Sequence, residues 1–152
     1  MESRMRILIV DDDQSERLLL RRYLERYGEC DFAENGLEAI ARVGQSLNEG
    51  KPYDLICLDI SMPKLDGHKT LKEIRHLERL HLNGYESKIV MISAIRSVRT
   101  VMEAFGEMCD AYLTKPFEKK KLFEKIESLG FAKMEANTPR RNAANLESGI
   151  MN

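Results

Sequence analysis

Short apolar runs alternate along this chain with longer segments in which apolar residues recur every three or four positions. Four of the runs are unbroken by polar residues and together rich in β-branched side chains, as is typical of strands buried on both faces: 7–10, 55–58, 89–92 and 111–113. A weaker candidate at 30–33 is closed by the turn signal Asn35-Gly36. The apolar pattern therefore predicts five short buried strands.

The segments between these runs have the spacing of amphipathic helices and predict helices over 13–27, 36–47, 70–80, 97–108 and 118–129. Asp13 is expected to cap the first helix, and Glu16, three residues later, to complete a capping box. Strand and helix thus alternate five times, which predicts an α/β fold with a parallel sheet covered by helices on both faces. In such sheets, ligands bind outside the carboxyl ends of the strands.

Length and composition indicate one ordinary domain, because the chain has 152 residues, of which 43% are hydrophobic and 32% charged. The periodic pattern ends after Phe131, so we expect a folded domain over 4–131 and a flexible tail over 132–152. We favour a stand-alone protein over one in which the tail leads to a further domain. The net charge of −1 gives no global attraction to nucleic acid or to an anionic membrane.

The cellular setting is expected to be the cytoplasm. The sequence shows no signal peptide and no apolar stretch near the roughly 20 residues that span a bilayer. The three cysteines, Cys30, Cys57 and Cys109, are odd in number and do not have metal-ligand spacing. We expect them to be reduced and structural.

The polar residues that end the predicted strands carry the chemistry. Asp11 to Asp13 follow the first strand, Asp59 the third, Ser93-Ala94 the fourth and Thr114-Lys115-Pro116 the fifth. Taken alone, the acidic run would fit a helix cap and Lys115 a solvated loop. Because the carboxyl ends of parallel strands meet at one rim, their joint occurrence instead favours a single site.

Several carboxylates within a few Å repel one another, and a divalent cation removes that repulsion. Hard oxygen ligands favour Mg²⁺, or Mn²⁺, which takes one or two carboxylates together with water and phosphate. Lys115 offers a mobile positive charge and Ser93 a hydroxyl donor to phosphoryl oxygens. Asp59 is then the candidate nucleophile, since aspartates form acyl phosphates.

Four segments resemble the receiver domain of two-component response regulators, in particular the stand-alone regulators of chemotaxis: 7–12, 58–67 with Asp-x-x-Met-Pro-x-x-Asp-Gly, 92–94 and 112–117 with Lys-Pro-Phe. The resemblance covers about 4–131. It implies a flavodoxin-like three-layer sandwich with five parallel strands in the order 2-1-3-4-5 and five flanking helices.

The resemblance also implies roles for individual residues. Asp59 would be the phosphoacceptor. Asp12 and Asp59 would bind the metal directly, together with the backbone carbonyl of Ser61, and Asp11 would act through a metal-bound water. The backbone at Ile60 and Ala94 would contact the phosphoryl group, as would the side chains of Lys115 and Ser93.

In the implied switch, Ser93 moves toward the phosphoryl group and Tyr112 turns inward behind it. The surface of the fourth helix, fifth strand and fifth helix then changes shape. The Lys115-Pro116 bond is often cis in this family. Ile95 is apolar and cannot orient an attacking water, so we expect slow loss of the phosphate. The stretch 76–88 is longer than a minimal receiver needs and extends the third helix or forms a bulging loop.

The function implied is that of a regulator phosphorylated by a histidine kinase or a histidine phosphotransfer protein and read by a downstream protein partner. It would be a monomer or a phosphorylation-dependent dimer. We expect neither direct DNA binding nor membrane association, and no enzymatic activity beyond its own phosphorylation and dephosphorylation. Three alternatives remain open: a haloacid dehalogenase-type phosphatase, which needs Asp where Ser61 stands, a flavin-binding protein, and a receiver that has lost phosphorylation.

Overall fold

The computed structural model of the chain describes residues 5–59, 66–81, 84–94, 97–106 and 108–133. In this part of the chain, five strands alternate with five helices in the predicted order. The elements are β1 (Arg6–Val10), α1 (Gln14–Leu24), β2 (Glu29–Ala33), α2 (Gly36–Asn48), β3 (Leu55–Asp59), α3 (Gly67–Leu80), β4 (Lys88–Ser93), α4 (Val98–Gly106), β5 (Ala111–Thr114) and α5 (Lys119–Ser128).

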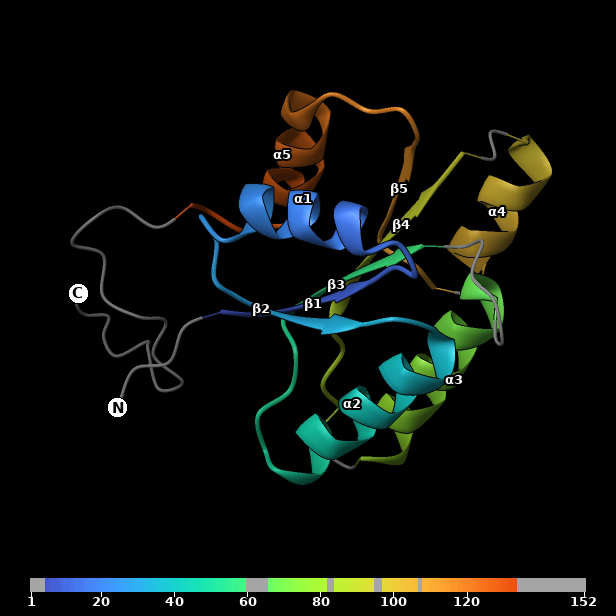
Figure 1. Cartoon of the computed structure of the whole chain (residues 1–152). Helices are drawn as coiled ribbons and strands as arrows, with labels where there is room; N and C mark the ends of the chain where they lie inside the picture. The colour runs from blue at the N-terminus through green and yellow to red at the C-terminus, as the bar shows by residue number, and fades with distance from the viewer. Residues whose placement is uncertain (1–4, 60–65, 82–83, 95–96, 107, 134–152) are drawn as a thin grey trace.

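The strands form one sheet in the order β2-β1-β3-β4-β5, and every neighbouring pair is parallel. This arrangement confirms the predicted sheet and its strand order. Helices α1 and α5 lie on one face, and α2 and α3 on the other (Figure 1). None of the helices in the described part has the length and apolar composition that crossing a membrane requires.

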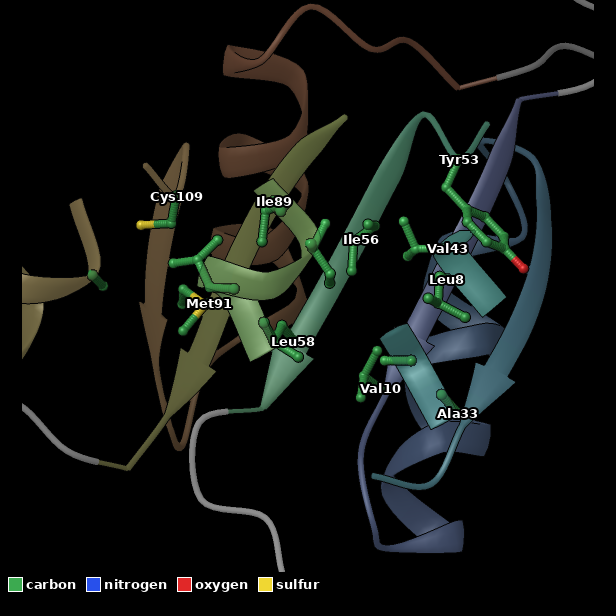
Figure 2. Packing of buried hydrophobic residues seen from close by; sticks show 14 of the residues in the cluster. Leu8, Val10, Ala33, Val43, Tyr53, Ile56, Leu58, Ile89, Met91 and Cys109 are labelled. Atoms are coloured by element: carbon green, nitrogen blue, oxygen red, sulfur yellow. The ribbon is translucent and has the colours of Figure 1, made fainter. Parts of the chain in front are cut away.

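The core consists of two apolar layers, one on each face of the sheet. Leu8 and Val10 of β1 pack with α2, α3 and α4, while their neighbours Ile7 and Ile9 pack with α1 and α5. Figure 2 shows the first layer, in which alternate residues of β1, β3 and β4 project to the same side. Because both faces are covered, the central strands are apolar at all positions except their ends, which explains the unbroken runs in the sequence.

Two helix boundaries differ from the prediction by three residues, and the others differ by at most two. Helix α1 ends at Leu24 rather than at Tyr27. The chain turns there because the Tyr27 N–H donates to the Leu24 carbonyl at 2.8 Å, and the Tyr27 hydroxyl donates to Glu127 of α5 at 3.0 Å. Helix α3 begins at Gly67, three residues early, because the Asp66 side chain caps it by accepting from the Lys69 N–H at 2.9 Å.

A buried ionic network closes the end of the sheet where β4 and β5 begin. Arg75 of α3 is 2% exposed, and its guanidinium donates to Glu78 at 2.7 Å, to Asp110 at 2.8 Å and to the Ser87 carbonyl at 2.8 Å. Glu78 accepts from the Ser87 N–H at 2.9 Å and from its hydroxyl at 2.7 Å. Ser87, in the long segment after α3, is therefore fastened to that helix, which ends at Leu80 as the apolar spacing predicted. Residues 82–83 lie outside the described part, so the choice between a longer helix and a bulging loop stays a prediction.

Replacing Arg75 should be strongly destabilising. The variant Arg75→Met leaves the Glu78 and Asp110 carboxylates without their cation, so the free energy of unfolding should fall by about 3–5 kcal/mol. Urea unfolding followed by circular dichroism measures the change. Arg99→Met is the matched control: it breaks the exposed 3.7 Å pair with Glu103 and should leave the free energy of unfolding nearly unchanged. Equal losses in the two variants would contradict this view of the network.

Candidate functional site

The carboxyl ends of the strands meet at one rim, where the predicted strand-end residues lie. Asp11 directly follows β1, Asp59 and Ser93 are the last residues of β3 and β4, and Lys115 directly follows β5. Backbone hydrogen bonds continue the ladders there, from the Asp11 N–H to the Ala33 carbonyl at 3.1 Å and from the Lys115 N–H to the Ser93 carbonyl at 2.7 Å. Asp11, Asp59 and Ser93 are 2%, 7% and 1% exposed. The fold therefore holds two carboxyl groups and a hydroxyl where water has little access.

The Lys115 ammonium lies among three acidic groups. Its Nζ is 2.6 Å from Oε1 of Glu16, 3.6 Å from Oδ2 of Asp59 and 3.8 Å from Oδ2 of Asp11. Burial disfavours the charged ammonium, but the hydrogen bond to Glu16 and the charges of Asp59 and Asp11 outweigh burial and raise the pKa of Lys115. Lys115 is therefore a fixed positive charge at neutral pH.

Glu16 is free to reach this site because Asp11, and not Glu16, accepts the hydrogen bond from the Asp13 N–H. Asp13 caps α1 as predicted, its Oδ1 accepting from the N–H groups of Ser15 and Glu16 at 2.8 and 3.2 Å. The reciprocal half of the predicted capping box is wrong, since the Asp13 N–H donates to Oδ1 of Asp11 at 2.9 Å. With that donor occupied, the Glu16 carboxylate extends to Lys115. Sequence reasoning assigned Glu16 a local role and so missed it as a site residue.

The pKa values of Asp11 and Glu16 differ in the direction in which the site shifts them. Burial, with smaller contributions from the hydrogen bond to Glu16 and the charge of Asp59, raises the pKa of Asp11 to about 7. The hydrogen bonds from Lys115 and Asp11 lower the pKa of Glu16. The pKa values of the two carboxyl groups are thus shifted in opposite directions. Burial disfavours the charged form of Asp11 and is the largest cause of its raised pKa.

The carboxylates are arranged as a hard cation would require. One oxygen each of Asp11, Glu16 and Asp59 lies within 4.8 Å of the other two. Closely grouped carboxylate oxygens fit Mg²⁺ or Mn²⁺. This group differs from the predicted ligand set, because it contains Glu16 and not Asp12, whose side chain is exposed. The Ser61 carbonyl lies outside the described residues, so the roles of Asp12 and Ser61 stay predictions.

The two predicted switch residues are already in contact. Tyr112 is 7% exposed and belongs to the core layer of α2 and α3. Burial raises the pKa of its hydroxyl, and a hydrogen bond with Ser93 opposes that shift. The expected inward turn of Tyr112 is therefore not needed to bury the ring in this structure.

Three further expectations concern the backbone near the rim. The Lys115-Pro116 peptide bond is cis, which confirms what the resemblance implied. Ala94 is exposed at the end of β4, and its contact with a phosphoryl group stays a prediction. Ile60 and Ile95 lie outside the described residues, and so do the expected tail residues after 133.

The sequence and fold match one family. A family model described as the response regulator receiver domain matches residues 7–127. The chain therefore belongs to the response regulator receiver domain family, which confirms the resemblance and the fold that it implied.

Relatives in this family differ in length. The transcriptional regulatory protein ResD of Bacillus subtilis (strain 168) is 36% identical over 143 residues, which cover 90% of this chain and 55% of ResD. The chemotaxis protein CheY of the same organism is 32% identical over 123 residues, covering 80% of this chain and 93% of CheY. The chain thus spans about half of ResD and nearly all of CheY.

A solved structure of a complex is similar as well. The CheX-CheY-BeF3-Mg+2 complex from Borrelia burgdorferi contains a chain that superposes with a TM-score of 0.71 at 26% identity, covering 82% of this chain and 88% of that one. The likeness extends over the sheet and the helices on both of its faces.

Removing the Asp11 charge should stabilise the metal-free protein. Because the pKa of Asp11 rises from 3.8 to about 7 on folding, the unfolded chain releases this proton at a lower pH than the native state does. The contribution of Asp11 to stability is therefore fully present below pH 3.8 and is lost progressively as pH rises to about 7. Asp11→Asn should therefore raise the free energy of unfolding by about 2 kcal/mol at pH 7.5, and by less at pH 5.

Urea unfolding in the presence of EDTA at the two pH values measures this gain. Asp12→Asn is the matched control, since it removes the neighbouring, exposed carboxylate and should change stability little at either pH. A gain of the same size in both variants would show that general charge reduction, and not burial of Asp11, is responsible.

Proposed function

We propose that this protein is a response regulator of a two-component system that is activated by phosphorylation on Asp59. The phosphoryl group would come from a histidine kinase or a histidine phosphotransfer protein, with Mg²⁺ or Mn²⁺ required. The observation that carries the proposal is the convergence of Asp11, Asp59 and Lys115 at one buried rim, with the lysine Nζ 3.6 Å from Asp59 and 3.8 Å from Asp11. A nucleophile, a hard-cation site and a fixed positive charge are what phosphoryl transfer to a carboxylate needs.

In the proposed reaction, a carboxylate oxygen of Asp59 attacks phosphorus. The new P–O bond forms as the P–N bond to the donor imidazole breaks, and the imidazole leaves with that electron pair. Lys115 neutralises negative charge on the transferring group, and the backbone at Ile60 and Ala94 orients its oxygens. A bound Mg²⁺ would add positive charge opposite Lys115. A relative named as a complex with BeF3 and Mg²⁺ supports this assignment.

The proposed signal passes from Ser93 to Tyr112, which lies in the same core layer as α4. Phosphorylation places negative charge and acceptor oxygens beside the Ser93 hydroxyl, which then exchanges its hydrogen bond with Tyr112 for one with the phosphoryl group. Tyr112 is left to find a new partner, and the surface of α4, β5 and α5 changes with it. Apolar side chains already lie exposed at this surface, with Met102 67%, Phe105 47% and Met108 48% exposed. A downstream protein would read them.

Acetyl phosphate tests the acceptor. With Mg²⁺ present, the wild-type protein should gain a single phosphoryl adduct detectable by intact mass, and Asp59→Asn should gain none because the nucleophile is gone. Chelation with EDTA should suppress the wild-type adduct. Asp54→Asn is the matched control, because it lies just before the other end of β3 and accepts a hydrogen bond from the Arg6 N–H at 2.8 Å, which an asparagine can also accept. An adduct on Asp59→Asn, or none on the wild type with any donor, would refute the proposal.

The phosphate on Asp59 should be long-lived. Ile95, two residues after Ser93, cannot hydrogen-bond an attacking water, so hydrolysis proceeds without an oriented nucleophile. After removal of the donor, intact mass at successive times should give a half-life of minutes or longer. Ile95→Gln, which supplies a polar side chain at the same position, should shorten it. Decay of the wild-type adduct within seconds would contradict the prediction.

A further inference from the structure

The strongest interaction of the site lysine is not with the residues that the proposed reaction uses. Lys115 Nζ lies 2.6 Å from Glu16, a full ångström nearer than to Asp59 at 3.6 Å. Glu16 is in the first turn of α1 and Lys115 follows β5, so this contact joins segments 99 positions apart in the chain. At 2.6 Å it is a short, charge-assisted hydrogen bond, the stronger class of such bonds.

The position of Glu16 is not explained by local helix chemistry. A glutamate three residues after an N-cap ordinarily accepts from the cap N–H, but here Asp11 accepts from that N–H at 2.9 Å. The Glu16 side chain is 42% exposed, so its carboxylate also has access to solvent. It nevertheless turns inward to Lys115. The capping interaction that would explain a glutamate at this position is therefore not made. The interaction that Glu16 does make is the hydrogen bond with Lys115.

Space for the carboxylate to leave exists next to it. Glu16 and Lys115 both border a pocket of about 460 Å³ that is otherwise lined by Leu19, Pro116 and Phe117, among others. Since the Glu16 side chain is 42% exposed, rotation of this side chain toward solvent separates the carboxylate from the ammonium. The pair can therefore open without movement of the α1 backbone.

We propose that Glu16 is an internal competitor for Lys115: in the resting protein its carboxylate holds the ammonium that the phosphoryl group on Asp59 must later take. Glu16 is thus a positioning residue that acts through Lys115, and it restrains phosphorylation. The inference rests on the proposed function, because the competition described here is between Glu16 and a phosphoryl group on Asp59. Phosphoryl oxygens win this competition once they are covalently held beside the lysine.

The rate of phosphorylation tests the competition. At saturating Mg²⁺ and a fixed concentration of acetyl phosphate, Glu16→Gln should increase the initial rate of adduct formation about three- to tenfold, the range of one exposed charge-assisted hydrogen bond. Glu16→Asp keeps the charge but is too short to reach Lys115, and should also be faster than the wild type. Glu25→Gln, which removes the same charge at the exposed other end of α1, should match the wild type.

A double-mutant cycle separates action through Lys115 from simple charge repulsion. Beryllium fluoride, titrated calorimetrically in the presence of Mg²⁺, should bind about three- to tenfold more tightly to Glu16→Gln than to the wild type. In the Lys115→Ala background, the same change of Glu16 should have no effect. An equal gain in both backgrounds would overturn the positioning role, because Glu16 would then act by its charge alone.

Three further results are decisive. If Glu16→Gln is phosphorylated more slowly and a Mg²⁺ titration without fluoride shows weaker binding, Glu16 serves the metal and the inference is wrong. If the wild type is phosphorylated and Glu16→Gln is no faster, the inference alone fails. If the wild type forms no adduct with any donor, the proposed function fails and the inference with it.

Discussion

The repulsion between buried carboxyl groups at the end of a parallel sheet is the constraint on which this structure depends. Neighbouring parallel strands bring Asp11 and Asp59 to the same rim, where each is less than a tenth exposed. The protein meets the resulting electrostatic cost with one backbone N–H, which donates to Asp11, and with one lysine. Neither removes the negative charge entirely, so the rim stays receptive to a cation. In the proposed function, the same incomplete compensation leaves Asp59 able to accept a phosphoryl group.

At the opposite end of the sheet, two carboxylates are paired with an arginine. There the Arg75 guanidinium binds Glu78 at 2.7 Å and Asp110 at 2.8 Å. Each of these carboxylates also accepts from a backbone N–H. A network with complete pairing has one favourable arrangement and resists change. At the rim, by contrast, Lys115 has three acidic neighbours at unequal distances. The fold thus combines a rigid end with an end whose partners can exchange.

The sequence predicted the sheet and most of the rim because both follow from patterns along the chain. Unbroken apolar runs mark strands covered on both faces, and the polar residue that ends each run must lie at the shared rim. Glu16 could not be found this way, since its spacing from Asp13 already had a local explanation and the competing bond from Asp11 exists only in the folded chain. The orientation of Tyr112 was equally hidden. The side on which an aromatic ring packs depends on the space left by α2, α3 and α4, which no local pattern encodes.

The hydrogen bond from the Lys115 N–H to the Ser93 carbonyl, at 2.7 Å, has a consequence for how information leaves the site. It ties the segment that carries the Ser93 hydroxyl to the segment that carries the Lys115 ammonium. If Asp59 is phosphorylated as we propose, the two side chains expected to contact the phosphoryl group are coupled through the backbone. A displacement of the β4 end would then also displace the end of β5, and a partner bound over β5 would read one coupled movement.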